Sequence, residues 1–122
     1  MPLTRDFRET VKARAERDPA FRVALFEEAV RALVEGDLPT ARILLRDVIN
    51  ATIGFAQLAE ALGIGEKSLM RMYGPTGNPR ADNLLATLAA LRAHVGVEVR
   101  VKASASPGRA RKTAGARHAI AA

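Results

Sequence analysis

The chain has 122 residues, of which 48% are hydrophobic and 26% are charged, enough for one compact domain with tails. The absence of cysteine excludes a disulfide framework, a thiolate zinc site and a cysteine nucleophile, and it favours a reducing cytoplasm. Charged residues interrupt the start of the chain and no apolar run is long enough to cross a bilayer, so we expect neither a signal peptide nor a membrane segment.

The formal net charge of +6 is unevenly distributed along the chain. Residues 1–50 hold nine basic and nine acidic groups, residues 51–102 hold six and four, and residues 103–122 hold four and none. The positive excess therefore lies in the second half and the tail. This distribution fits a polyanionic partner, although a basic tail would also serve solubility.

The first half of the chain predicts three helices. Apolar residues recur every four positions between residues 3 and 15. The next two helix starts are each marked by an aspartate that can cap the helix and a proline in its first turn, at Asp18-Pro19 and at Asp37-Leu38-Pro39. The second helix ends at Gly36, and the third runs to about Asn50. Their expected inward residues are Phe7, Val11 and Ala15, then Phe21, Leu25, Val30, Leu33 and Val34, then Ile43, Leu44 and Val48, with Leu45 as a further candidate. We interpret residues 1–37 as an N-terminal helical extension that serves as scaffold and association surface.

The stretch 54–73 predicts two short helices that meet at a tight turn. In the first helix the spacing of the apolar residues indicates one buried face, and Gly63 ends the helix in a left-handed conformation. In the second helix Leu69 and its apolar neighbours face inward, while the polar residues face solvent. The inward residues are Phe55, Leu58, Ala59, Leu62, Leu69, Met72 and Tyr73, and the outward ones are Lys67, Ser68, Met70 and Arg71. This layout predicts a helix-turn-helix within residues 38–95, or else an ordinary amphipathic surface helix.

Residues 74–79 are rich in turn formers and predict a loop before a last helix that begins near Arg80. That helix carries a leucine stripe, which indicates either core or a dimer seam. After Gly96, residues 97–101 alternate apolar and polar, so residues 96–102 predict a short strand. A lone strand needs a partner, so it pairs with its own copy, pairs with another protein or is merely an extended end. Residues 103–122 predict a disordered basic tail.

The second helix of the pair carries the candidate DNA-reading side chains. Lys67 and Arg71 are four residues apart and so lie on one face. Arg71 can pair bidentately with guanine, and Lys67 and Ser68 can contact a base or a phosphate. The alternative for each residue is a solvated surface group.

Three more polar residues are candidates for phosphate contact. Gln57 lies early in the first helix of the pair, beside amides that suit an anion. Asn78 and Arg80, in the loop and at the start of the next helix, can clamp a neighbouring phosphate. Each of the three is alternatively a solvated surface group or a local cap.

Four motifs together carry a resemblance to a known family: Asp18-Pro19 with Phe21, Gly36-Asp37, the stretch 54–73, and Gly77-Asn78-Pro79. Over residues 5–101 the chain resembles the small bacterial regulators known as probable addiction-module antidote proteins, which are related to HigA-type antitoxins. The resemblance implies an all-α, lambda-repressor-like helix-turn-helix bundle with extra N-terminal helices. It also implies recognition positions at Glu66, Lys67, Ser68, Met70 and Arg71, with Gly65 where a Ser or Thr cap is usual.

By the same resemblance the protein is a homodimer that binds double-stranded operator DNA and represses transcription, with a RelE-like ribonuclease toxin as partner. The alternative is a protein-interaction module that neutralises such a toxin, with DNA binding secondary. A third possibility is a helical assembly protein without a nucleic-acid role.

Enzymatic function is not expected from this sequence. His94 and His118 have no carboxylate or serine at a spacing that indicates a triad or a metal site. Glu27 and Glu28 are adjacent on a helix and point about 100° apart, so they cannot form a catalytic pair. We therefore expect no catalytic residue, no metal and no cofactor.

Overall fold

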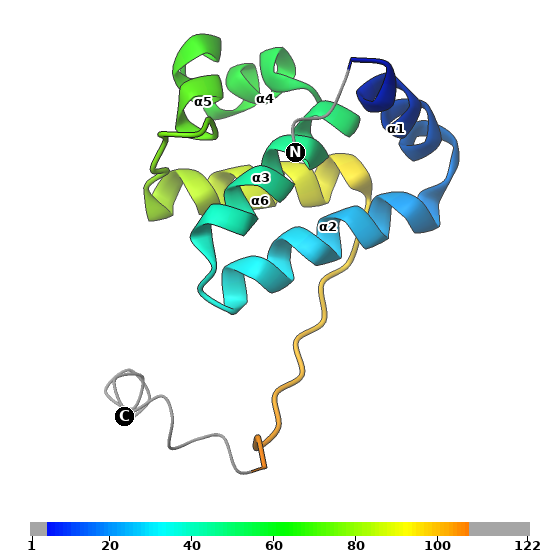
Figure 1. The fold of residues 1–122 in the computed structure, drawn as a ribbon, viewed down its shortest axis with the longest axis vertical. Coiled ribbons are helices and arrows are strands. Elements are labelled where there is room, and N and C mark those ends of the chain that lie inside the picture. Colours follow the sequence, from blue (N-terminus) through cyan, green and yellow to red (C-terminus); the bar gives the residue numbers. More distant parts are fainter. Residues whose placement is uncertain (1–4, 108–122) are drawn as a thin grey trace.

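The computed structural model describes residues 5–107, with side chains from residue 10 onward. Within this range the chain forms six α-helices (Figure 1): α1 Arg5–Arg17, α2 Pro19–Val34, α3 Leu38–Ala51, α4 Phe55–Leu62, α5 Glu66–Met72 and α6 Ala81–Val95. The predicted all-α class is confirmed. The expected disordered tail falls largely on residues 108–122, which lie outside the described residues.

Both Asp-Pro signals begin helices as predicted. The Asp18 carboxylate accepts a hydrogen bond from the Phe21 amide at 3.3 Å, and the Asp37 carboxylate accepts one from the Thr40 amide at 3.2 Å. Hydrogen bonding from the Thr40 side chain and backbone lowers the pKa of Asp37. These caps satisfy free amides in the first turns of α2 and α3 and therefore fix where the two helices start.

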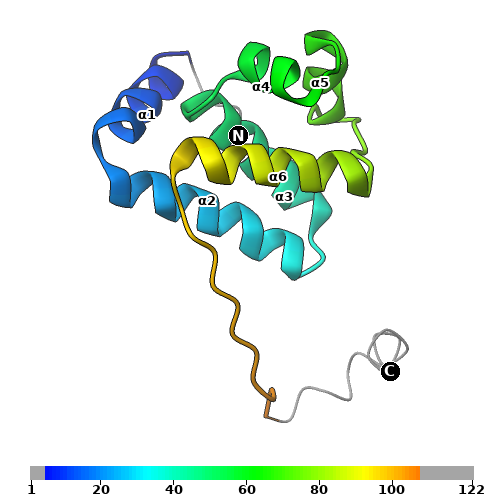
Figure 2. The ribbon, with the colours of Figure 1, turned by 180° about the vertical axis from the view of Figure 1, so that it is seen from behind.

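Helices α3 and α6 run through the middle of the molecule, with α4 and α5 on one side and α2 on the other (Figures 1 and 2). One hydrophobic cluster joins these layers: Phe26 and Ala29 of α2; Leu45, Val48 and Ile49 of α3; Phe55, Leu58 and Ala59 of α4; Leu69 and Tyr73 in and after α5; and Leu91 of α6. The N-terminal extension therefore shares its core with the rest of the bundle through α2.

Two inward assignments from the sequence are wrong. Ile43 is 58% exposed, whereas its neighbour Leu45 is fully buried, and Val34 is 81% exposed. Each lies in an apolar run, where two neighbouring helix faces are equally hydrophobic. Packing against the adjacent helices, which periodicity does not contain, decides which face is buried.

The predicted strand at residues 96–102 is also wrong. Within residues 5–107 no strand forms, and the chain after Gly96 instead runs away from α6 past α2 in an extended conformation (Figure 2). Val97 packs against the core, but Val101 is 89% exposed. A strand needs a second strand to pair its backbone groups, and the described chain folds into helices that offer none.

None of the helices in the described range is long and apolar enough to cross a membrane.

Candidate nucleic-acid interface

Helices α4 and α5 form a compact pair joined by residues 63–65. Gly63 is left-handed, with φ 71° and ψ 30°, and the amide of the next residue, Ile64, donates to the Ala59 carbonyl at 3.1 Å. Gly65 is extended and is followed directly by α5, with no side-chain cap. The predicted turn therefore reverses the chain within three residues, which places α5 against α4.

The inner side of α5 is anchored in the core. Leu69 is fully buried and belongs to the same cluster as Leu58 and Ala59 of α4. Tyr73, directly after α5, is 1% exposed, and its hydroxyl donates to Thr87 Oγ1 of α6 at 2.8 Å. The Thr87 hydroxyl in turn donates to the Asn83 carbonyl at 2.8 Å. This chain of hydrogen bonds ties the end of α5 to α6, and burial raises the pKa of Tyr73.

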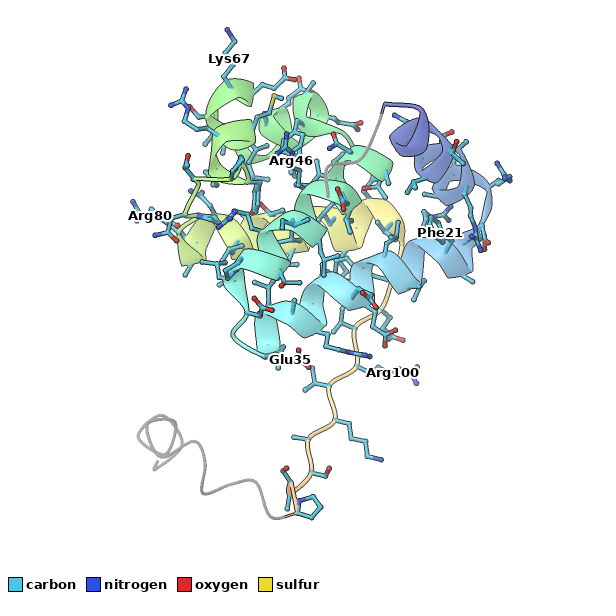
Figure 3. The ribbon with its side chains drawn as sticks, in the orientation of Figure 1. Phe21, Glu35, Arg46, Lys67, Arg80 and Arg100 are labelled. Atoms are coloured by element: carbon cyan, nitrogen blue, oxygen red, sulfur yellow. The ribbon has the colours of Figure 1, made fainter. Side chains whose placement is uncertain are left out.

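The outer side of α5 is open to solvent. All five predicted recognition positions are exposed: Glu66, Lys67, Ser68, Met70 and Arg71. Neither Lys67 nor Arg71 forms an ion pair with another described residue. Figure 3 shows Lys67 pointing away from the bundle. The two cations are therefore free to contact an external partner.

Gln57 is exposed at the third position of α4. The residue before this helix is Gly54, with φ 83°, so no side chain caps the first turn. Three features thus meet at the start of α4: uncapped amides, the positive end of the helix dipole and an amide side chain. Together they suit a phosphate oxygen.

The loop at residues 74–79 is held tightly against the end of α5. A Cβ atom on Gly77 would lie 2.1 Å from the Met72 carbonyl oxygen and 2.3 Å from that of Arg71, far inside contact distance. The Gly77 amide donates to the Gly74 carbonyl at 3.0 Å, which closes a turn. Only glycine allows this approach.

Arg42 of α3 fastens the same loop from the other side. Its guanidinium donates to the Gly77 carbonyl at 3.2 Å and to the Pro75 carbonyl at 3.1 Å. The loop is therefore held by α5 and α3 together. This restraint positions the two exposed residues that follow, Asn78 and Arg80.

Arg80 stands just before α6, at the outer edge of the molecule in Figure 3. Its Nε lies 3.4 Å from Asp82 Oδ1, and both side chains are largely exposed. An exposed pair of this kind is weak, so a phosphate can compete with Asp82 for the guanidinium.

The structure therefore presents all eight predicted residues on the surface, but it groups them in three places. Five lie on α5, Gln57 lies at the start of α4, and Asn78 with Arg80 lies beyond the loop. Among the described residues, no side-chain hydrogen bond or ion pair joins one of the eight to another.

Sequence reasoning missed Arg42 and Arg46. They lie one turn apart on α3, with Arg42 half-buried under the loop and Arg46 exposed on the side of α3 seen in Figure 3. The Arg42 contacts join residues more than 30 positions apart, so no local pattern could have indicated them.

Among the described residues, no group of three or more His, Cys, Asp or Glu side chains is placed to hold a metal ion.

The fold and its exposed helix pair define a small all-helical domain in which α5 presents a polar, partly cationic face to solvent. No protein family, curated protein or solved structure matches this chain. The resemblance to addiction-module antidote proteins therefore rests on the motifs quoted from the sequence.

Proposed function

We propose that the protein is a cytoplasmic, homodimeric transcription regulator that reads operator DNA through a helix-turn-helix formed by α4 and α5. The observation that carries this proposal is the two-sided character of α5. Leu69 is fully buried, whereas Lys67, Ser68 and Arg71 on the same short helix are exposed. A recognition helix needs this combination, because it must stay fixed to the domain while its polar side chains enter the major groove.

Each group of surface residues takes a role that DNA geometry requires. Arg71 would read guanine O6 and N7, and Lys67 and Ser68 would contact a base edge or the backbone. Gln57 with the first amides of α4, and Asn78 with Arg80 beyond the loop, would hold phosphates on the two sides of the groove. Glu66 and Met70 would lie beside these contacts on the same helix face and contribute to base preference.

The proposal is tested by selecting a preferred duplex from a random library and measuring its affinity by fluorescence anisotropy. Arg71→Ala should weaken binding to the selected duplex by about 1–3 kcal/mol and weaken random DNA much less, because it loses a base contact. Lys67→Ala should weaken both duplexes to a similar degree and reduce the slope of log affinity against log salt by about 0.9 if it contacts one phosphate.

Arg17→Ala is the matched control. It removes the same charge from α1, which lies away from α5 in Figures 1 and 2, and Arg17 is exposed and takes part in no ion pair among the described residues. Its effect should be small. Equal losses from Arg17→Ala and Arg71→Ala would show that the chain binds DNA only through its net charge and would refute the assignment of α5.

A second candidate function is neutralisation of a RelE-like ribonuclease toxin by the N-terminal helices or by residues 97–101. The exposed valines Val23 and Val34 of α2, with Val99 and Val101, favour a protein-binding surface there. Co-expression with the product of a neighbouring gene, followed by an assay for messenger RNA cleavage, tests it. A toxin that remains active in the presence of this chain would argue against neutralisation.

A further inference from the structure

More than half of the large apolar side chains that are exposed in the described range gather at one place. Of the seven large hydrophobic residues exposed in the described range, four line a groove of about 510 Å³ between α2 and residues 97–102: Val23, Val34, Val99 and Val101. Clustered apolar exposure of this kind is unfavourable in water unless another surface covers it. The groove is therefore a candidate interface.

The backbone beside this groove also has hydrogen-bonding groups that no neighbouring strand pairs. Residues 97–101 are extended, but no strand lies beside them in the part of the chain that the structure describes. The Val97 amide donates to the Arg92 carbonyl at 3.2 Å, but no backbone hydrogen bond is formed by residues 98–101 within the described chain. The backbone groups of residues 98–101 form an open edge, which is a template for a second extended segment. A partner that supplies a strand would satisfy these groups and cover the valines together.

The side-chain order of residues 97–101 is self-complementary. The sequence is Val-Glu-Val-Arg-Val. When two copies run antiparallel with Val99 facing Val99, Glu98 of each copy faces Arg100 of the other, and Val97 faces Val101. Valines then meet valines on one face, and opposite charges meet on the other.

The alternative registers are worse. Sliding one strand by two residues places either Arg100 opposite Arg100, a register in which Glu98 faces Lys102, or Glu98 opposite Glu98. A parallel pair in register places both pairs of like charges opposite each other. Sliding by one residue turns the valines of one strand away from those of the other. Only the register centred on Val99 satisfies both faces.

In the isolated chain, the two charged residues pair with each other instead. Arg100 donates to Glu98 Oε1 from Nε at 3.3 Å and from a terminal guanidinium nitrogen at 3.1 Å. This contact shows that the two side chains lie on one side of the segment. Both are more than 75% exposed, so either can exchange its neighbour for a residue on a second copy.

We propose that residues 97–101 pair antiparallel with the same residues of a second copy, about a two-fold axis at Val99. The axis is perpendicular to the resulting ribbon, so the α2 helices of both copies lie against its valine face. This inference specifies the dimer interface of the proposed regulator. It rests on the proposed function, because a regulator with two-fold symmetry reads two half-sites of a palindromic operator. The test below contains no DNA, so its failure is distinct from failure of DNA binding.

Cysteine cross-linking tests the register, since the chain has no native cysteine. Val99→Cys places the two thiols opposite each other at the axis, within reach of a disulfide. Val101→Cys is the matched control, because in this register the two copies of residue 101 are separated by about 13 Å along the strands. Val101 is 89% exposed and Val99 only 46%, so random collision would favour the control. We expect Val99→Cys to cross-link much faster under mild oxidation.

Charge reversal tests the contact between copies. Glu98→Arg alone places Arg opposite Arg, and Arg100→Glu alone places Glu opposite Glu, so in sedimentation equilibrium each variant should dimerise about tenfold or more weakly than the wild-type chain. An equal mixture of the two variants should form heterodimers about as tightly as the wild type does. Neither variant regains the pair within its own chain, so only a contact between copies explains such a rescue.

Three results would overturn the proposal: a wild-type chain that stays monomeric, cross-linking of Val101→Cys as fast as that of Val99→Cys, or a mixture that associates no better than the separate variants. A monomeric wild type would leave the groove to a different protein, such as the toxin of the second candidate function.

Discussion

Two exposed regions of this molecule differ in what they show to solvent. The outer face of α5 shows mainly polar and charged side chains, and its backbone is already paired within the helix. The groove between α2 and residues 97–102 shows valines, and in the extended segment beside it residues 98–101 have no backbone partner among the described residues. Both regions are exposed, but only the second leaves apolar side chains uncovered and extended backbone unpaired.

The difference indicates two kinds of partner. A polar helix face is stable in water by itself and gains from a partner that brings opposite charge, such as a phosphate backbone. An apolar groove with an open backbone edge is costly in water and gains from a partner that brings apolar area and hydrogen bonds. We therefore propose nucleic acid as the partner of the first region and a second copy of the chain as the partner of the second.

The largest predicted effect concerns the attachment of α5 to the hydrophobic core. Leu69→Ala removes a fully buried side chain that joins α5 to the core, and we expect a loss of about 2–5 kcal/mol in the free energy of unfolding. Met70→Ala, on the 43% exposed neighbour, should change it by less than about 0.5 kcal/mol. Urea denaturation followed by circular dichroism measures both. Equal effects would show that α5 is not anchored as described.

The second prediction concerns the loop that positions Asn78 and Arg80. Gly77→Ala places a Cβ atom 2.1 Å from the Met72 carbonyl oxygen, and because the obstacle is backbone, no rotamer change relieves it. We expect a loss of about 1–3 kcal/mol in the free energy of unfolding.

Gly65→Ala is the control for this change, since its nearest neighbour would be the Ser68 hydroxyl at 3.8 Å, an ordinary contact. The same urea titration should place Gly65→Ala within about 0.5 kcal/mol of the wild type. If both alanine variants are equally stable, the close approach of the loop to α5 is refuted.

The fold was largely predictable where the cause is local. The caps at Asp18 and Asp37 and the left-handed Gly63 are encoded within a few residues of where they act. Four of the exposed positions on α5, namely Lys67, Ser68, Met70 and Arg71, followed from the spacing around Leu69, because a helix with one buried face must expose the other. Glu66 was expected from the family resemblance.

What failed depends on neighbours that are remote in sequence. Ile43 is exposed and Leu45 buried because of how α3 packs between other helices, and the run of apolar residues there is ambiguous by itself. Arg42 fastens a loop more than 30 residues away. The strand at residues 96–102 failed because alternation indicates the capacity to pair, whereas a strand exists only when a partner is present.

The third prediction uses the only tyrosine of the chain. Tyr73→Phe removes one buried hydrogen bond, while the Thr87 hydroxyl keeps its own bond to the Asn83 carbonyl, so we expect a loss of about 1 kcal/mol.

The burial of Tyr73 also predicts that the stability of the fold depends on pH. Burial raises the pKa of Tyr73 above its ordinary value of about 10, so the fold favours the neutral phenol. That contribution to stability is fully present below the unfolded pKa and is lost as pH rises through the folded pKa. Tyrosinate absorbance should therefore appear together with unfolding. Ionisation at the ordinary pKa in a folded chain would contradict the burial of Tyr73.

The smallest predicted effect tests the second region. Val34 is 81% exposed on α2 and Val48 is 1% exposed on α3, so the same Val→Ala change should separate them. At protein concentrations low enough to keep the chain monomeric, Val34→Ala should change the free energy of unfolding by less than about 0.5 kcal/mol, and Val48→Ala should lower it by roughly 1.5–3 kcal/mol.

At protein concentrations high enough for dimerisation, Val34 is expected to matter. Because Val34 lines the groove that the second copy is proposed to cover, Val34→Ala should weaken dimerisation measurably in sedimentation equilibrium, whereas a side chain that merely faces water would leave it unchanged. If Val34→Ala leaves the free energy of unfolding unchanged but weakens dimerisation, the exposed valines contribute to contacts between two copies of the chain. A variant that is neutral in both measurements would remove Val34 from the interface and restrict it to residues 97–101.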